Sequence, residues 1–217
     1  MLATPAALQR PEVARVVSRL KRPPLEVDAG VLDGLADSDS PRGLLALARL
    51  PRTGCASLPS GGDAVVLFLD GVQDPGNVGA LARVAEAFGA RALALSAGCA
   101  HPNHPRALRA SAGSLLRLPV AVEATVSGVD DRLGGRVRWT ALAAHGGRPL
   151  DTLEWRSGAW VLAVGAEGAG LSSALEARLD ERWTIPLAGR VESLNVAVAG
   201  GIALYSLAAA RRRTPSA

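Results

Sequence analysis

The sequence predicts an α/β domain over residues 64–210, with a mostly parallel sheet and helices on both faces. From residue 64 onward, short apolar runs alternate with helical patterns, and this order is typical of β–α–β units. The run at residues 160–164 is continuously apolar and ends at Gly165, as expected for a strand buried on both faces. On these patterns alone, the domain is a doubly wound open sheet.

The strands and helices expected in this domain are short, and turn residues such as Gly, Pro, Asn and Asp separate them. The predicted strands cover residues 64–69, 92–95, 118–122, 137–144, 160–164 and 183–186. The predicted helices cover residues 78–88, 124–133, 171–179 and 196–210, and a polar loop with a short helical piece is expected at 101–113.

The first of these helices follows Asp-Pro-Gly-Asn at residues 74–77, and Asn77 is expected to be its N-cap. Leu81, Val84 and Phe88 recur at helical spacing and predict one apolar face. Arg83 lies off this face, where a solvated surface arginine is the simplest interpretation.

The last helix, from Val196, is apolar on nearly every side, which predicts burial rather than an amphipathic position at the surface. Gly200 and Gly201 lie inside it, and each costs about 1 kcal/mol relative to alanine. A helix that tolerates both is expected to pack very close to another backbone. Ser193 and Asn195 precede the helix and are candidate caps.

The remaining segments are smaller. Residues 1–52 form a first segment with a helix at 13–20, a strand at 25–27 and a helix capped by Asp28, and residues 44–50 return as a strand or a short helix. Residues 53–63 are rich in Gly, Ser and Pro and are interpreted as a linker, and residues 211–217 as a basic tail.

Composition limits the possible partners. The chain of 217 residues has a net charge of +4, and its basic side chains are almost all arginine, which suits contacts with phosphate. An aromatic content of 3% argues against a stacking platform for single strands. We see neither a signal peptide nor an apolar run long enough to cross a bilayer, and we expect a cytoplasmic protein without membrane partners.

The loop Gly-Ala-Glu-Gly-Ala-Gly at residues 165–170 follows a buried strand, where parallel sheets bind ligands. A dinucleotide fingerprint requires glycine where Glu167 stands, and a carboxylate there repels a pyrophosphate. The loop therefore suits a ligand with cationic or hydrogen-donating groups. His101 and His104 lack further ligands at suitable spacing, so no metal site is predicted.

Four motifs occur in order along the chain: Asp-Pro-Gly-Asn-Val-Gly-Ala-Leu-Ala-Arg (74–83), Arg-Ala-Ser-Ala-Gly (109–113), the loop at 165–170, and Ile-Pro…Glu-Ser-Leu-Asn-Val-Ala (185–197). Together they resemble the SpoU (TrmH-like) family of RNA 2′-O-ribose methyltransferases in the SPOUT superfamily, over residues 64–207. Residues 1–52 resemble the end of the ribosomal-L30e-like substrate-binding domain that often precedes this catalytic domain. The segment is short, so much of that domain is expected to be missing.

The resemblance implies that S-adenosylmethionine binds in a C-terminal trefoil knot, whose close threading would account for the two helix glycines. The sequence pattern alone does not predict a knot, because knots are essentially absent from folds. By motif match, backbone groups of Gly165, Ile185 and Leu194 line the cofactor pocket. The neighbouring residues expected to assist are Val164, Ala166, Pro186 and Leu187.

The same resemblance gives Arg83 the activating role toward the ribose 2′-oxygen. Asn77, Glu167, Ser193 and Asn195 are then expected to hold Arg83 and the ribose in place. Two versions stay open. Arg83 acts as a base assisted by an RNA phosphate, or it stays charged, orients that phosphate and stabilises a developing alkoxide.

The family further implies an RNA substrate and a homodimer whose active site lies near the interface. The L30e-like segment favours ribosomal RNA over transfer RNA. Candidate phosphate contacts are Arg106, Arg109, Ser111, Arg190 and the cluster of Arg211, Arg212 and Arg213.

Four alternatives remain at this point: a transfer-RNA ribose methyltransferase, a SPOUT enzyme that methylates a base nitrogen, an RNA-binding protein without catalysis, and an oxidoreductase with a nucleotide cofactor. The pairing of Asn77 with Arg83 and the Ser-Leu-Asn run favour ribose over base nitrogen. Intact motifs argue against lost catalysis, and Glu167 argues against the oxidoreductase.

Overall fold

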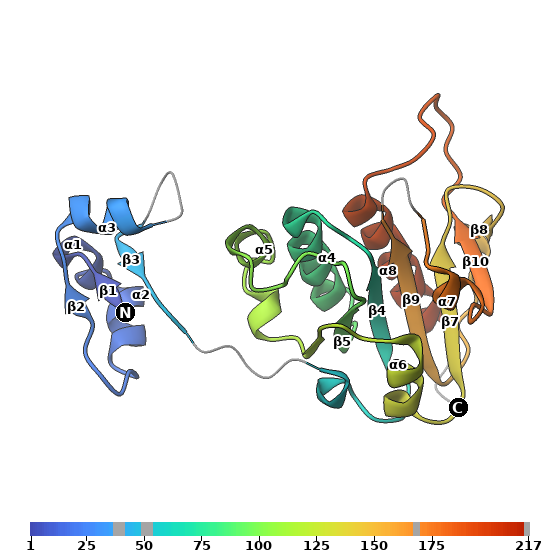
Figure 1. Cartoon of the computed structure of the whole chain (residues 1–217), viewed down its shortest axis with the longest axis horizontal. Coiled ribbons are helices and arrows are strands. Elements are labelled where there is room, and N and C mark those ends of the chain that lie inside the picture. The colour runs from blue at the N-terminus through green and yellow to red at the C-terminus, as the bar shows by residue number, and fades with distance from the viewer. Residues whose placement is uncertain (37–41, 49–53, 167–169, 215–217) are drawn as a thin grey trace. The chain divides into compact units, whose positions relative to one another are not determined.

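The computed structural model describes residues 1–36, 42–48, 54–166 and 170–214 (Figure 1). It divides into two compact units, Met1–Pro51 and Arg52–Ala217. The linker predicted at 53–63 includes the short 3-10 helix η1 (Cys55–Ser57).

The first unit is a three-stranded sheet with short helices. Its central strand β1 (Leu2–Ala3) pairs in parallel with β2 (Leu25–Glu26) and antiparallel with β3 (Leu44–Leu45). The helices are α1 (Pro5–Leu8), α2 (Pro11–Val17) and α3 (Ala29–Leu35). Asp28 precedes α3 as predicted, but its side chain makes no capping hydrogen bond.

The second unit contains a seven-stranded sheet in the order β6-β5-β4-β9-β7-β10-β8, in which every described pair of strands is parallel. The α/β prediction is therefore confirmed. The strands are β4 (Val65–Asp70), β5 (Ala92–Leu95), β6 (Val120–Ala121), β7 (Val137–Leu142), β8 (Arg148–Pro149), β9 (Ala159–Gly165) and β10 (Glu181–Thr184). Only β8 was not predicted, because two exposed residues ending in proline carry no strand pattern.

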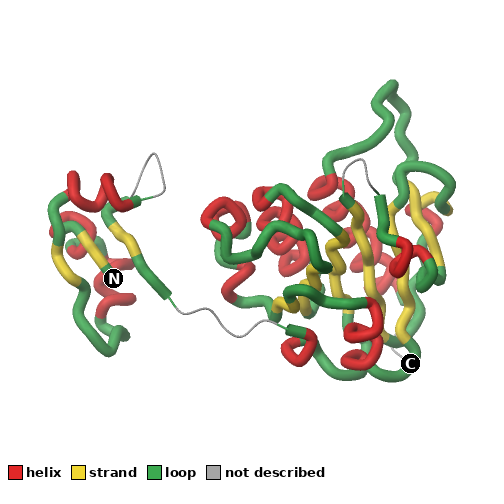
Figure 2. The backbone as a smooth tube through the Cα atoms, viewed as in Figure 1, coloured by secondary structure: helices red, strands yellow, loops and turns green. Residues whose placement is uncertain are grey.

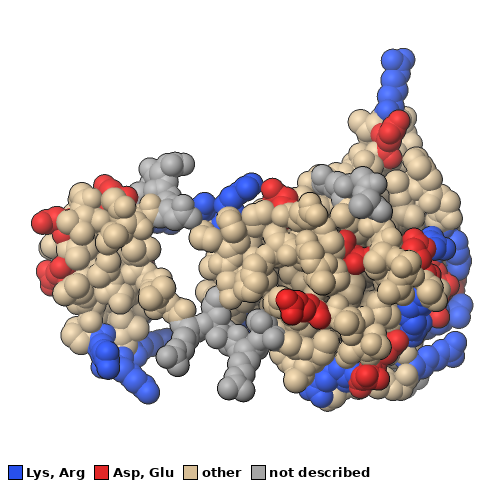
Figure 3. All heavy atoms as spheres, in the orientation of Figure 1, with Lys and Arg blue, Asp and Glu red and all other residues tan. Residues whose placement is uncertain are grey.

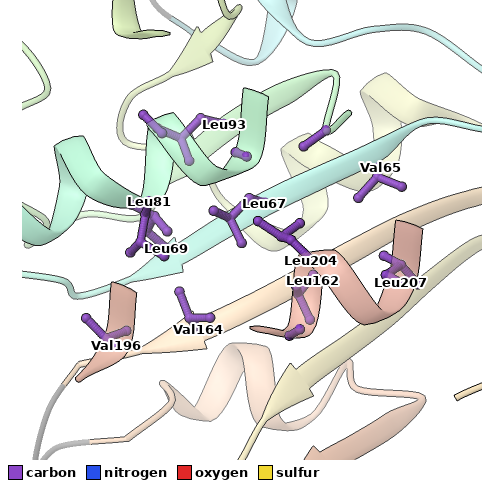
Figure 4. Close-up of a cluster of buried hydrophobic side chains, with 14 of the residues drawn as sticks. Val65, Leu67, Leu69, Leu81, Leu93, Leu162, Val164, Val196, Leu204 and Leu207 are labelled. Carbon is purple, nitrogen blue, oxygen red and sulfur yellow. The ribbon is translucent and has the colours of Figure 1, made fainter. Parts of the chain in front are cut away.

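Alternate residues of β4 enter two different hydrophobic cores. Val65, Leu67 and Leu69 face the layer of α4 (Pro75–Ala87) and α8 (Val196–Arg213), as Figure 4 shows. Val66 and Phe68 face the layer of α6 (Val126–Leu133) and α7 (Ser173–Glu176). The two-residue period of the strand thus places helices on both faces of the sheet.

Three further short elements complete the first layer. Helix α5 (Pro105–Ala110) packs on α4, followed by the 3-10 helix η2 (Ser114–Leu116), while η3 (Leu150–Thr152) lies near α8. A Cβ at Gly79 would lie 2.2 Å from the Ala107 carbonyl oxygen, so α4 and α5 can approach this closely only with glycine there.

The predicted cap of α4 was wrong. The helix begins one turn earlier, because Pro75 occupies its first position and the Asp74 carboxylate accepts a hydrogen bond from the Asn77 N–H at 3.0 Å. That hydrogen bond is the main reason why the pKa of the Asp74 carboxyl lies below its ordinary value. The side chain of Asn77 is therefore available for another role.

The prediction that α8 is buried on nearly every side was also wrong. Its inner face packs on the sheet and on α4, but Val198, Ile202 and Tyr205 remain 52%, 38% and 54% exposed. These three residues are spaced i, i+4 and i+7, so they form one apolar stripe on the outer side of the helix.

The two glycines of α8 also have a different explanation from the predicted one. A Cβ at Gly200 would lie 2.5 Å from Cδ2 of Leu81, so the close neighbour is a side chain of α4 rather than a backbone. Gly201 would meet Val84 only at an ordinary contact distance of 3.6 Å. Gly200 alone is required by this packing.

The predicted tail begins too early in the sequence, because α8 continues through Arg213. The guanidinium of Arg211 lies over the ring of Trp155 at 4.9 Å, and Trp155 stacks on Trp160. A cation placed over an aromatic face stabilises the end of this helix and orders Arg211.

Glu86, near the end of α4, ties this helix to η2. Its carboxylate accepts two hydrogen bonds from Arg117, at 2.6 and 2.7 Å, and one from the Ser114 hydroxyl at 2.6 Å. The contact with Arg117 and then that with Ser114 lower the pKa of Glu86 to about 2. A carboxyl group with a lowered folded-state pKa stabilises the fold above its unfolded pKa, and this stabilisation is lost as the pH falls toward 2.

We therefore expect Glu86→Gln to melt at a lower temperature than the wild type at pH 7, and the difference to shrink as the pH falls from about 5 to about 2. Thermal unfolding followed by circular dichroism across this range measures it. Glu154→Gln, which changes an exposed carboxylate outside the contact, serves as the control. A difference in melting temperature that stays constant with pH would contradict the role of the ionised carboxylate.

Candidate active site

A cavity of about 710 Å³ opens at the carboxyl ends of β7, β9 and β10. Its walls come from three connections: the residues after β7, the loop after β9, and the long connection from β10 to α8, which Figure 2 shows as a loop. Parallel sheets bind ligands at this edge, so the cavity is the candidate site.

The structure brings six of the seven predicted cofactor residues to this cavity. Its lining includes Val164, Gly165, Ala166, Ile185, Leu187 and Leu194, whereas Pro186 is exposed and outside it. Two of the predicted catalytic residues, Ser193 and Asn195, also line the cavity. Glu167 lies outside the described residues.

Sequence reasoning missed the wall that follows β7. Leu142, Ala143, Ala144 and His145 line the cavity there. The predicted strand ran to residue 144, so this segment was assigned to the sheet rather than to its edge. Ligands bind beyond the carboxyl ends of parallel strands, and this rule applies to β7 as well. It could have predicted this wall of the cavity.

The loop after β9 has a closely packed base. A Cβ at Gly165 would lie 2.4 Å from the carbonyl oxygen of Gly170, and Ala166 forms an isolated β-bridge with Gly170. Because only glycine lets the two sides of the loop approach this closely, Gly165 keeps this wall of the cavity in place.

The charge of the cavity excludes one class of ligand. Among the described lining residues there is no lysine or arginine, and the ionisable ones are His145, Glu176 and Glu192. Glu176 pairs with Arg182 outside the cavity. A pocket without cations does not suit a pyrophosphate, whereas it accepts a neutral or cationic ligand.

Asn195 joins the two helices that border the site. Its side-chain oxygen caps α8 by accepting from the N–H groups of Ala197 and Val198, at 3.0 and 3.4 Å. Its amide nitrogen donates to the side-chain oxygen of Asn77 on α4 at 3.0 Å. Two residues 118 positions apart in the sequence are thus held together at the rim of the cavity.

Arg83 does not converge on this pair within the chain. It lies about 9 Å along the axis of α4 from Asn77 and about 120° round it. The side chain is exposed, is not part of the cavity lining, and has no ion pair with any described residue. The predicted catalytic set is therefore divided between the cavity and the outer surface of α4.

The predicted RNA contacts fall into different environments. Arg106, Arg109 and Arg190 are all exposed, and Arg106 pairs with Asp74 at 3.3 Å. Ser111 is a correction, because it is fully buried and its hydroxyl donates to the Leu108 carbonyl at 2.8 Å. It stabilises the turn after α5 and cannot reach a phosphate.

Basic and acidic side chains are mixed along the edge of the sheet formed by β10 and β8, on the face seen in Figure 3. Glu181 pairs with Arg138 at 2.9 Å and with Arg148 at 3.9 Å. Arg148 also lies over the ring of Trp183 at 5.0 Å. These arginines are already engaged with acidic and aromatic partners, so this edge is not a simple phosphate-binding surface.

The described residues contain no group of three or more His, Cys, Asp or Glu side chains placed to hold a metal ion. None of the helices in the described ranges is both long and apolar enough to span a bilayer. The cytoplasmic location stays a prediction.

Comparison with known proteins identifies similar chains. The model of the SpoU rRNA Methylase family matches residues 64–205. The 23S rRNA (guanosine(2553)-2′-O)-methyltransferase RlmP of Bacillus subtilis is 32% identical over 212 residues, which cover 93% of this chain and 83% of the relative.

Two solved structures share the fold. An AdoMet-bound rRNA methyltransferase from Sinorhizobium meliloti has a TM-score of 0.82 and 29% identity, covering 99% of this chain and 80% of that one. The SpoU methyltransferase AviRb from Streptomyces viridochromogenes, in complex with AdoMet, has a TM-score of 0.87 at 24% identity, covering 99% and 83% of the two chains. At that identity, the similarity to AviRb concerns the fold.

Proposed function

The chain belongs to the SpoU rRNA methylase family, and from that premise we propose that it methylates a ribose 2′-hydroxyl of ribosomal RNA. It is an S-adenosylmethionine-dependent RNA 2′-O-methyltransferase, as its family and the 2′-O-methyltransferase relative establish. The observation that carries the site assignment is the cavity at the carboxyl edge of β7, β9 and β10, which is lined by six of the seven predicted cofactor residues.

The cavity fits this cofactor on its own chemistry. Most of its lining residues are aliphatic or glycine, which suits an adenine and a ribose, and its described lining has carboxylates but no cationic side chain. S-adenosylmethionine supplies a methyl group on a positively charged sulfonium. Gly165, Ile185 and Leu194 would hold it through their backbone groups, as the family motifs imply, and Leu142 with Ala143 forms the wall on the side of β7.

Ribosomal RNA is favoured by the extent of the similarity. The Bacillus subtilis relative, whose name specifies 23S rRNA, is aligned over 93% of this chain. That alignment is longer than the 64–205 region of the family model and so includes part of the first unit. We therefore propose that the first unit also takes part in recognising ribosomal RNA.

Arg83 acts as a cation in this scheme. Its guanidinium is exposed to water and has no ion pair with a described carboxylate. An arginine side chain is a permanent cation in proteins. It orients the phosphate beside the target nucleotide and stabilises the negative charge that develops on the 2′-oxygen as its proton passes to water. Asn77 and Asn195 hold the ribose at the rim of the cavity.

A homodimer explains why Arg83 is separated from the cavity. Helices α4 and α8 lie side by side on one face of the sheet, and their outer sides form one surface. That surface carries the apolar stripe Val198, Ile202 and Tyr205, with Tyr205 packed edge-on against Phe88 at 5.6 Å. A second copy that covers this stripe brings Arg83 of one protomer to the cavity of the other.

The trefoil knot belongs to the same proposal. It is supported by the position of α8, which follows β10 in the sequence but packs under β4 and β9, as Leu204 and Leu162 illustrate in Figure 4. In this arrangement the loop at residues 185–195 passes the cofactor before the chain returns to the sheet.

Removing the guanidinium tests the role of Arg83. Arg83→Ala should lower kcat at least about 10²-fold, because a stabilising cation is lost from the transition state, while the Kd for S-adenosylmethionine stays unchanged. Transfer of a radiolabelled methyl group and calorimetry measure the two quantities. Arg91→Ala, which removes another exposed arginine, is the matched control, and Arg83→Lys should retain part of the activity. Normal turnover by Arg83→Ala would remove this residue from the mechanism.

Mixed dimers test whether Arg83 acts across the interface. One protomer carries Arg83→Ala and the other carries Ala143→Trp, which fills its own cavity, and different affinity tags isolate the mixed species. Each parent homodimer should be inactive, whereas the mixed dimer should regain activity because one of its two sites combines an open cavity with an intact partner arginine. A mixed dimer as inactive as its parents, or a protein that stays monomeric, would contradict the shared site.

A further inference from the structure

Asp70 is a buried carboxylate to which neither the motifs nor the mechanism gives a role. It is the last residue of β4, is 6% exposed, and pairs in register with Gly165 of β9. It therefore lies beside the first residue of the loop that forms one wall of the cavity.

The carboxylate of Asp70 reaches the other end of that loop. Its Oδ2 accepts a hydrogen bond from the backbone N–H of Ser172 at 2.6 Å, across 102 positions of the sequence. Ser172 follows Gly170 and Leu171, which both line the cavity, and it caps α7 by accepting from the Leu175 N–H. Such a hydrogen bond between buried groups is costly to lose, because the donor left behind has no partner.

The surroundings of Asp70 reinforce this arrangement. The next residue, Gly71, has a left-handed backbone with φ of 69°, donates its N–H to the Ser96 hydroxyl at 3.0 Å, and passes close to Ala166. The Ala166–Gly170 bridge holds the two sides of the loop together. Among the contacts described, only the hydrogen bond between Asp70 and Ser172 connects the end of the loop, after Gly170, to β4.

We propose that Asp70 is a positioning residue for the cofactor, which holds the Gly170–Leu171 wall of the cavity at the correct distance by fixing the Ser172 N–H. This inference rests on the proposed function, since it assumes that the cavity binds S-adenosylmethionine. Asp70 acts through the loop and does not contact the reacting atoms. Its loss should therefore weaken cofactor binding without lowering the rate of the saturated enzyme.

Three variants of the full chain separate the hydrogen bond from the charge. Asp70→Ala removes both, Asp70→Asn keeps an acceptor oxygen without the charge, and Ser172→Pro removes the donor from the other side. Proline is compatible with Ser172, whose φ of −68° and ψ of 152° lie in its preferred region. Ser172→Ala is the comparison for Ser172→Pro, because both lose the capping hydroxyl and only the proline also loses the N–H.

We expect the Kd for S-adenosylmethionine, measured by calorimetry without RNA, to rise about tenfold or more in Asp70→Ala, and in Ser172→Pro relative to Ser172→Ala. Asp70→Asn should recover most of the affinity. In methyl-transfer assays, the KM for the cofactor should rise in the same variants, while kcat and the KM for RNA stay within about twofold. Thr125→Ala, which removes the cap of α6 on the other face of the sheet, controls for general loss of stability.

Two results would overturn the proposal. Unchanged affinity in Asp70→Ala or in Ser172→Pro would mean that the contact does not shape the cavity. An equal loss in Asp70→Asn and Asp70→Ala would assign the effect to charge rather than to the hydrogen bond. If Asp70→Ala does not fold, the proposal is tested by the difference in cofactor Kd between Ser172→Pro and Ser172→Ala. Failure of the wild type to bind the cofactor would instead reject the proposed function.

Discussion

The candidate site depends on the close packing of α8 against α4. Gly200 allows α8 to lie on Leu81, and this contact aligns the first turns of the two helices. The hydrogen bond between Asn195 and Asn77 then connects the motif before α8 with the motif at the start of α4. Because Val196 and Ala199 of α8 also line the cavity, any shift of this helix would change the helix interface and the ligand site together. Stability and function therefore depend on the same contact.

Much of the fold could be predicted because it follows from local patterns. Buried parallel strands are short apolar runs, and each predicted strand of the second unit was found. The cap of α4 was misplaced because Asp74 and Asn77 are both good caps, and the proline between them decides in favour of Asp74. The exposed stripe of α8 could not be predicted from the sequence. When a helix is apolar on all sides, its pattern does not indicate which side packs against the rest of the chain and which side stays exposed. Asp70 and the segment after β7 depend on contacts between residues distant in sequence, which no local pattern contains.

Charge is distributed in a way that suits the chemistry. The cavity has carboxylates but no cationic side chain in its described lining, as a sulfonium cofactor requires. Several arginines elsewhere are engaged, with Arg138 and Arg148 on Glu181, Arg117 on Glu86, and Arg211 over Trp155. The basic composition alone thus overstates the surface available to RNA. Arg83 differs from these residues, because it is exposed on α4 without an ion pair to any described residue.

The reaction proposed for this chain is the transfer of a methyl group to a ribose 2′-oxygen of ribosomal RNA. The most direct measurement incubates the purified protein with S-adenosylmethionine and either unmodified ribosomal RNA or unmodified transfer RNA, followed by digestion to nucleosides and mass spectrometry. We predict a 2′-O-methylated nucleoside from the ribosomal RNA and none from the transfer RNA. A methylated base, or methylation confined to transfer RNA, would contradict the account.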